Sequence, residues 1–170
     1  MIRITEEQFD AAFAIMEASF PTDEYRPYTE QKALFSREEY RMYGMVEAGE
    51  ICAFAAVWEL GEITFLEHLA VAETHRNRGL GAALLQDLAA CANGTICLEV
   101  ELPETDLSRR RIGFYERCGF SFNEYDYTQP PISKGKSPIP LRIMSHGGPL
   151  SEMGFHHVRD TLYRTVYGVK

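Results

Sequence analysis

The sequence predicts a mixed α/β domain with a β-α-β unit at its centre. Three strand-like apolar runs follow one another over residues 42–72, the apolar period then changes from two to three or four over 80–88, and another strand-like run occupies 95–102. The chain has 170 residues, 45% hydrophobic and 25% charged, which suits one compact globular domain. We therefore expect a single domain over residues 1–170.

The charge balance limits the classes of partner. A net charge of −8 and a pI near 5.1 argue against a nucleic-acid surface or an anionic membrane surface, because both need a contiguous positive field, and they favour a cationic partner. No apolar run is long enough to span a membrane, and no secretory signal pattern opens the chain. The four cysteines form no C-x-x-C pair, so we expect buried, reduced thiols in a cytoplasmic protein.

The first half of the chain alternates helices and strands. Residues 1–21 indicate a short strand and then a helix, because Thr5 and Gln8 have capping-box spacing and the helix precedes Pro21. A second amphipathic helix is expected within residues 22–44, as a candidate lid over the substrate. The strands 42–48 and 51–60 are expected to form a hairpin through Gly49-Glu50, followed by the strand 62–72.

The second half continues this pattern. The helix that begins near Leu80 is expected to end near Asn93-Gly94, where the glycine suits a left-handed cap. A strand over 95–102, a helix over 105–118 that stops at Gly119, strands over 120–130 and 139–146, and a helical tail over 149–168 complete the chain. A β-α-β unit places ligands at the carboxyl end of a strand, which draws attention to the turn before Leu80.

That turn, "THRNRGLGAALL", concentrates glycine and arginine at a helix start. The first turn of a helix has unpaired N–H groups and a partial positive charge, so it can hold a phosphate. Gly79 and Gly81 would let the anion approach closely, and Arg76 and Arg78 would add charged contacts. The motif is neither a Walker loop nor G-x-G-x-x-G. Taken alone, the motif favours a tight turn with solvated arginines over an anion site.

The longer segment "FLEHLAVAETHRNRGLGAALL" resembles the acetyl-CoA-binding motif of the GNAT N-acetyltransferase superfamily. Arg76, Gly79 and Gly81 occupy the places of the family's R-x-x-G-x-G. "CLEVE" resembles the family's fifth strand, and "GFYERCGF" resembles the segment that carries its catalytic tyrosine. The resemblance implies six or seven mostly antiparallel strands, splayed between the fourth and fifth, with helices on both faces.

The resemblance also implies the cofactor and the residues that bind it. Coenzyme A would place its pyrophosphate on the backbone amides from Arg78 to Ala82, and its pantetheine arm along Leu69 and Val71, with the amide of Val71 as the oxyanion donor. The full set of expected acetyl-CoA contacts is Leu69, Ala70, Val71, Arg76, Asn77, Arg78, Gly79, Leu80, Gly81, Ala82, Ser108, Arg111 and Tyr115.

The reaction implied is direct acyl transfer from the thioester to an amine. Tyr115 matches the family's general acid, although an amphipathic helix would also bury such a tyrosine as core. Glu67, on the face that Phe65, Leu69 and Val71 share, is the first candidate for the base. Glu99 is the second, because it matches a glutamate used by relatives that acetylate protein amino termini. His68 is expected to point to the opposite face and to pack against a helix.

The chain departs from the family pattern at Ser108 and Arg111, where relatives often have Asn-x-x-Ala, and it carries a basic run over 109–111. Tyr25, Tyr28 and Phe35 are candidate acceptor contacts. His156 and His157 have no third ligand at metal spacing, so no metal is expected.

Three functions stay open at this point. The first is acetylation of a small, cationic amine. The others are acetylation of protein or peptide amines, and non-catalytic acyl-CoA binding. Relatives are often dimers, so the resemblance also allows a homodimer.

Overall fold

The computed structural model describes residues 1–169, so residue 170 of the expected single domain lies outside the described residues. The described chain divides into two compact units, residues 1–59 with 66–92 and residues 60–65 with 93–169. The fold is mixed α/β, and in the described residues its eight strands form a mostly antiparallel sheet with one parallel pair. The expected fold class is confirmed, and short strands raise the number above the six or seven expected.

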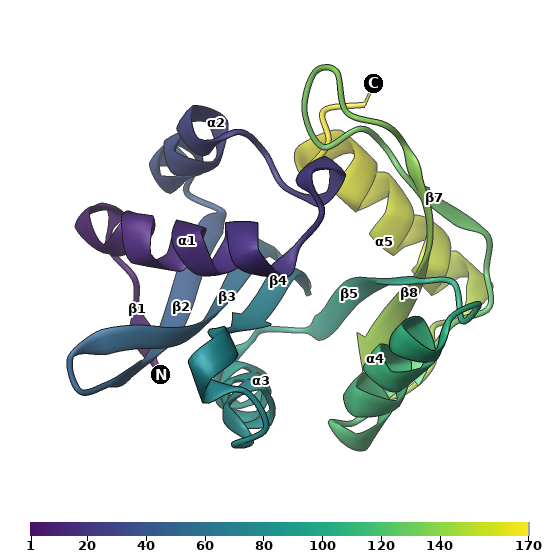
Figure 1. The fold of residues 1–170 in the computed structure, drawn as a ribbon. Helices are drawn as coiled ribbons and strands as arrows, with labels where there is room; N and C mark the ends of the chain where they lie inside the picture. The colour runs from purple at the N-terminus through teal and green to yellow at the C-terminus, as the bar shows by residue number, and fades with distance from the viewer. Residues whose placement is uncertain (170) are drawn as a thin grey trace. The chain divides into compact units, whose positions relative to one another are not determined.

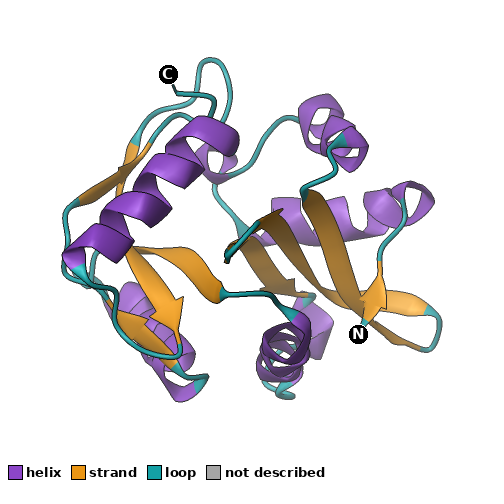
Figure 2. Ribbon diagram, turned by 180° about the vertical axis from the view of Figure 1, so that it is seen from behind, coloured by secondary structure: helices purple, strands orange, loops and turns teal. Residues whose placement is uncertain are grey.

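The first unit has the strand order β1-β2-β3-β4 (Figure 1). Helix α1 crosses one face of these strands and α3 lies on the other, as Figures 1 and 2 show from opposite sides. The elements in chain order are β1 (Ile2–Arg3), η1 (Glu6–Gln8), α1 (Phe9–Ser19), η2 (Thr22–Glu24), α2 (Tyr28–Ala33), η3 (Leu34–Ser36), β2 (Tyr40–Glu47), β3 (Glu50–Leu60), β4 (Ile63–Val71), η4 (Glu73–His75) and α3 (Leu80–Cys91).

Strand β3 is the centre of the core of this unit. All seven residues from Cys52 to Trp58 are buried, as expected for a strand with helices on both faces, and this explains why the run is continuously apolar rather than alternating. The capping box of Thr5 and Gln8 is present at the start of the first helical segment, as expected.

The second unit begins with the first residues of β4 and has the strand order β4-β5-β8-β6, with β7 paired to β8. Helices α4 and α5 cover opposite sides of these strands in Figures 1 and 2. The elements are β5 (Thr95–Glu101), α4 (Asp106–Arg117), β6 (Phe120–Phe122), β7 (Tyr127–Gln129), β8 (Ile139–His146) and α5 (Glu152–Thr165).

Two turns differ from the sequence-based expectation. The hairpin turn is Ala48-Gly49, not Gly49-Glu50, because Glu47 pairs with Glu50 and the two turn residues adopt φ values of 51° and 85°. Helix α3 ends at Cys91, two residues before Asn93. Gly94 is left-handed as expected, with φ 71°, but it turns the chain beside Glu62 rather than capping the helix.

The expected strand over 120–130 is two short strands instead. Asn123 is buried, and its amide nitrogen donates to the Ile143 carbonyl at 3.0 Å and to the Ser145 hydroxyl at 3.1 Å. Its amide oxygen accepts from the Leu150 N–H at 2.7 Å. Because these bonds fix the chain at Asn123, strand pairing stops there and resumes at Tyr127.

The cysteines were expected to be buried. Cys52 and Cys97 are buried, Cys118 is half-buried and Cys91 is exposed at the last residue of α3, so the expectation is wrong for Cys91. All four are free thiols. Within residues 1–169, no helix is both long and apolar enough to cross a bilayer.

Candidate functional site

The glycine-rich turn before α3 has the geometry of an anion-binding helix start. Gly79 is the N-cap, with φ 77° and no side-chain cap hydrogen bond, and Asn77 is also left-handed, with φ 61°. A Cβ added at Gly79 would meet no atom within 4 Å, so the turn faces open space. Leu80, Gly81 and Ala82 follow as the first turn of a helix of twelve residues, whose backbone N–H groups lack intrahelical partners. This turn fits a phosphate-bearing ligand.

The two arginines of this turn are already oriented by neighbours in the first unit. The Arg76 Nε donates to the Val71 carbonyl at 3.3 Å. The Arg78 Nη2 lies 2.9 Å from a carboxylate oxygen of Glu47, and the His75 Nε2 lies 3.7 Å from it. The Arg78 side chain is 51% exposed, so solvent weakens this pair and an anionic ligand can compete for the guanidinium.

Glu47→Gln is therefore expected to strengthen the binding of coenzyme A, by up to about fivefold in Kd, because Arg78 no longer has a competing carboxylate. Isothermal titration calorimetry with coenzyme A measures this. Glu59→Gln is the matched control, since Glu59 is also an exposed strand carboxylate paired with an arginine, at 3.8 Å from the Arg41 Nε. Equal affinities of the Glu47→Gln variant and the unaltered protein would show that Arg78 does not contact the ligand.

Strand β4 leads into this turn. Of the three residues expected along the pantetheine arm, Ala70 is buried, whereas Leu69 and Val71 are half-buried. The alternation places Glu67 on the same side as Leu69 and Val71, as expected.

The Glu67 carboxylate, however, does not face solvent. Its side chain is 2% exposed and forms an ion pair with Arg26, whose Nη1 donates to Oε1 at 2.8 Å. The Arg26 side chain is 6% exposed. Residue 67 as a whole is half-buried, so its exposed surface is that of the backbone and not of the carboxylate. Burial by itself would raise the pKa of Glu67, but the Arg26 guanidinium more than offsets it and holds the pKa below the ordinary value.

Further buried polar groups surround this pair in the first unit. The Arg26 N–H donates to the Gln31 side-chain oxygen at 3.3 Å, and the Gln31 amide nitrogen donates to the Tyr40 hydroxyl at 2.9 Å. The Arg26 guanidinium lies 5.8 Å from the centre of the Trp58 ring. These contacts tie the segment between α1 and α2 to strands β2, β3 and β4.

His68 also contacts the segment between α1 and α2. Its Nε2 lies 2.8 Å from the Glu24 carbonyl and must donate to it, and its ring packs edge-on against Phe20 at the end of α1. Burial lowers the pKa of His68, so the imidazole is neutral at pH 7. Its Nδ1 lies 3.6 Å from the Glu67 Oε2, and neither atom has a hydrogen-bond partner within the described residues. The expectation that His68 packs against a helix agrees with these contacts.

The candidate acceptor contacts of the first unit belong to an aromatic cluster on α1. Tyr25 packs edge-on against Phe13, Tyr28 packs against Phe9 and Phe13, and Phe35 packs against Phe9. The Tyr28 hydroxyl donates to Asp10 at 2.5 Å. Tyr25 is buried and Tyr28 is 39% exposed, so Tyr28 offers the larger surface to a ligand.

Glu99, on β5 in the second unit, is half-buried and accepts hydrogen bonds from two tyrosines. The Tyr127 hydroxyl donates to Oε1. The Tyr167 hydroxyl lies 2.9 Å from Oε1 and 2.8 Å from Oε2. Glu99 is therefore not a free strand carboxylate.

Tyr115, on α4, is 9% exposed and packs against Phe114 and Phe120. Burial raises its pKa to about 12, so the phenol is fully protonated at neutral pH.

Ser108 and Arg111, on the same helix, already have partners. Ser108 completes the capping box with Thr105: its N–H donates to the Thr105 hydroxyl at 3.0 Å, and its own hydroxyl accepts from the Thr105 N–H at 3.1 Å. The Arg111 Nη1 lies 2.7 Å from a carboxylate oxygen of Glu101. Ser108 lines a small cavity of about 290 Å³ in this unit. Arg109 is paired with Asp106, as expected for a solvated helix face.

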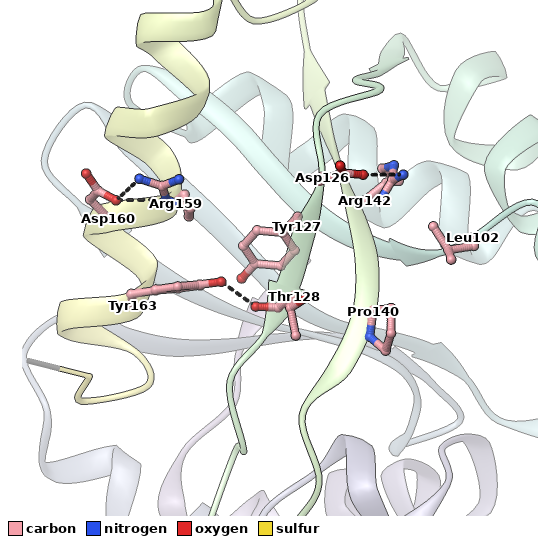
Figure 3. Close-up of a pocket in the computed structure, with 9 residues that line it drawn as sticks. All are labelled: Leu102, Asp126, Tyr127, Thr128, Pro140, Arg142, Arg159, Asp160 and Tyr163. Carbon is pink, nitrogen blue, oxygen red and sulfur yellow. Dashed lines mark hydrogen bonds and ion pairs between the residues drawn. The ribbon is translucent and has the colours of Figure 1, made fainter.

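A larger cavity of about 540 Å³ lies on the second unit (Figure 3). Arg142 pairs with Asp126 at 2.9 Å and Arg159 pairs with Asp160 at 2.8 Å, so its lining carries both signs of charge. Tyr127, whose hydroxyl contacts Glu99, is one wall. The lining residues are Leu102, Asp126, Tyr127, Thr128, Pro140, Arg142, Arg159, Asp160 and Tyr163.

No cluster of three or more metal-ligating side chains occurs in the part of the chain that the structure describes. His156 and His157 are both exposed on α5, and the His156 Nε2 lies 3.8 Å from Glu152 one helical turn away. The first unit thus contains a turn before α3 that suits an anion. The second unit contains the Glu99 carboxylate, which two tyrosines hydrogen-bond, and the protonated phenol of Tyr115.

Comparison with known proteins identifies the family. The profile of the acetyltransferase (GNAT) family matches residues 4–120, more than half of the chain. The chain belongs to the GNAT acetyltransferase family. A solved structure described as a GNAT-family acetyltransferase from Bacteroides thetaiotaomicron is 32% identical, with a TM-score of 0.88 over 99% of this chain and 98% of that one.

Other GNAT proteins are more distant. A ribosomal-protein-alanine N-acetyltransferase from Brucella melitensis shares the fold, with a TM-score of 0.63 at 17% identity over 85% of this chain and 96% of that one. A glucosamine 6-phosphate N-acetyltransferase from Candida albicans is 33% identical over 64 residues, which is 38% of this chain and 41% of the fungal protein. The sequence match thus spans less than half of that curated relative.

Three residues of these clusters escaped the sequence analysis: Arg26, Tyr127 and Tyr167. Arg26 is 41 positions from Glu67, and the two tyrosines are 28 and 68 positions from Glu99. Neither tyrosine lies within the GNAT profile, which ends at residue 120. Because each contact joins elements far apart in the chain, no local spacing in one sequence could have indicated it.

Proposed function

We propose that this GNAT protein transfers an acetyl group from acetyl-CoA to a primary amine of a small molecule. The observation that supports this most strongly is the turn at Gly79, which is left-handed, uncapped and open in front of the α3 amide groups, at the place where the GNAT motif requires a diphosphate site.

The residues assigned to acetyl-CoA are those of β4 and of this turn. The amides of Leu80, Gly81 and Ala82 would hold the diphosphate, with Arg76, Asn77 and Arg78 beside it, and Leu69, Ala70 and Val71 would hold the pantetheine arm. Acetyl-CoA supplies the activated thioester carbonyl. The amide of Val71 is assigned to the developing oxyanion, because a fixed backbone donor stabilises that charge without reorganising.

For the base we assign Glu99 rather than Glu67. The Glu67 carboxylate is enclosed and neutralised by Arg26 at 2.8 Å, so it would have to abandon a buried ion pair to accept a proton. Glu99 is half-buried, and the Tyr127 and Tyr167 hydroxyls donate to its carboxylate, so we assign it the proton that the amine loses.

Tyr115 is assigned to the departing sulfur. A cysteine-like thiol has a pKa of about 8.5, well below the pKa of about 12 for Tyr115, so the phenol keeps its proton and acts mainly as a hydrogen-bond donor to the thiolate.

The acceptor is proposed to be a small amine, steered by the net charge of −8. The cavity in Figure 3 carries both arginines and aspartates, which favours an amine that also bears an anionic group. The name of the fungal relative specifies an amino-sugar phosphate, which has this chemistry. We also propose that the protein is cytoplasmic and binds neither nucleic acid nor membranes. The proposal includes the formation of a homodimer.

The test is thiol release from acetyl-CoA across a panel of amines, each offered with and without a phosphate or carboxylate group. We expect turnover with at least one amine and a loss of about 10²-fold or more in kcat/KM for Glu99→Gln, the range of general acid–base catalysis. Tyr115→Phe should lower kcat with little change in KM. Tight binding of coenzyme A with no turnover on any amine would show a non-catalytic binding protein instead.

A further inference from the structure

The carboxylate of Glu99 is bonded by two phenols that come from different parts of the second unit. Tyr127 lies on β7 and donates to Oε1, whereas Tyr167 lies just after α5 and reaches both oxygens, at 2.9 and 2.8 Å. Both tyrosines lie beyond residue 120, where the match to the GNAT profile ends. This arrangement is therefore a property of this chain's own C-terminal segment, and the family motifs do not imply it.

The backbone fixes Tyr167 in place. After α5, the N–H groups of Val166 and Tyr167 both donate to the Leu162 carbonyl, at 2.9 and 3.1 Å, and the Val169 N–H donates to the Tyr163 carbonyl at 2.8 Å. These bonds form a tight turn that continues directly from the helix. The Tyr167 hydroxyl is therefore held at Glu99 by a rigid element rather than by a loose tail.

Tyr127 is fixed by burial. It is 3% exposed, and its ring lies 5.8 Å from that of Tyr163. Burial, followed by the neighbouring Glu99 charge, raises the pKa of Tyr127 far above its ordinary value, so this phenol is a permanent donor. Tyr163 also faces Glu99, and burial raises its pKa above the ordinary value, so this phenol keeps its proton at neutral pH as well.

Two donors on one carboxylate have a definite chemical effect. Hydrogen bonds to the ionised form stabilise it against protonation, and two donors from rigid elements also fix the plane of the carboxylate.

We propose that Tyr127 and Tyr167 are positioning residues that hold Glu99 ionised and oriented to accept a proton from the acceptor amine. The inference rests on the proposed function. In the step, an N–H bond of the amine breaks and an O–H bond forms on Glu99, while both phenols keep their protons. The C-terminal turn after α5 thereby becomes part of the acetyl-transfer machinery.

The experiment is the pH profile of kcat/KM for Tyr167→Phe and Tyr127→Phe, with the amine that gives turnover. Loss of one charge-assisted hydrogen bond is expected to move the acidic limb upward by about one pH unit or more. Above the limb, kcat/KM of Tyr167→Phe should recover to within about threefold of the unaltered enzyme, because the base itself is retained. Tyr125→Phe is the matched control, since its hydroxyl donates to the Leu150 carbonyl in the same unit, at 3.3 Å.

A second readout does not depend on turnover. The carboxyl ¹³C shift of Glu99, assigned through Glu99→Gln, should titrate at a higher pH in both phenylalanine variants than in the unaltered protein. Unchanged titration in both variants overturns the inference even if the enzyme is active. A protein with the expected titration shifts but no turnover on any amine would refute the proposed function and leave the hydrogen-bonding role of the tyrosines intact.

Discussion

Replacing Arg26 with methionine is expected to lower the free energy of unfolding by about 3–5 kcal/mol at pH 7, because it leaves the Glu67 carboxylate buried without a partner. Both side chains are almost fully enclosed, at 6% and 2% exposure, and they are 2.8 Å apart. Chemical denaturation monitored by circular dichroism measures the change. The low exposure is what separates this ion pair from the others in the first unit.

The effect should depend on pH in a predictable direction. In the unaltered protein the pKa of Glu67 is lowered, so its contribution to stability is present above the unfolded pKa and is lost as the pH falls through the folded one. In Arg26→Met, burial alone remains and raises that pKa, so folding is most penalised at neutral pH. The difference in unfolding free energy between the two proteins should therefore shrink from pH 7 to pH 4.

Two further variants test the cause. Arg26→Met combined with Glu67→Met should recover most of the lost stability, because replacing a whole buried pair with apolar groups removes the uncompensated charge. Arg41→Met is the surface control: Arg41 and Glu59 are 3.8 Å apart with Glu59 47% exposed, so a loss of at most about 1 kcal/mol is expected. A double variant no more stable than Arg26→Met alone would refute the explanation.

Gly94→Ala is expected to be the most damaging glycine substitution in the second unit, at about 3 kcal/mol or more. Gly94 has φ 71°, and a Cβ there would lie 1.9 Å from the Glu62 carbonyl oxygen. That carbonyl accepts the Thr95 N–H at 2.9 Å at the start of β5. The left-handed conformation of the alanine therefore lowers the free energy of unfolding by about 1–2 kcal/mol. Displacement of the backbone hydrogen bond lowers it by about another 1–3 kcal/mol.

Gly61→Ala separates these two contributions. Gly61 has a similar φ of 74°, but a Cβ there would meet nothing within 4 Å, so only the conformational cost of about 1–2 kcal/mol applies. The two variants should be compared by denaturant midpoint and by yield of folded protein. Equal destabilisation would show that the close approach to Glu62 relaxes freely.

Local patterns predicted most of the elements correctly. The capping box at Thr5, the helix that stops before Gly119 and the strand from Ile63 are confirmed, because each depends on neighbours only a few positions apart. One error arises because distant groups decide the local structure. Asn123 breaks the expected strand through bonds to Ile143, Ser145 and Leu150.

In the candidate site, too, the sequence indicated the features that depend on neighbouring residues and missed those that depend on distant ones. The glycine turn was recognisable because its chemistry belongs to consecutive residues: a left-handed Gly79, the first turn of α3, and arginines beside it. The sequence did not indicate which of the two glutamates is the base. In the sequence Glu67 and Glu99 are both acids in largely apolar strands, and only their partners distinguish them.

The sequence by itself thus determined the GNAT fold class and the turn that suits an anion, since helix starts, glycine conformations and strand periodicity are set by short-range sterics and hydrogen bonding. The tertiary structure alone decided the state of the two carboxylates. Burial and long-range contacts set the free energy of a charge: Arg26, 41 residues away, neutralises Glu67, whereas Tyr127 and Tyr167, 28 and 68 residues away, donate hydrogen bonds to Glu99.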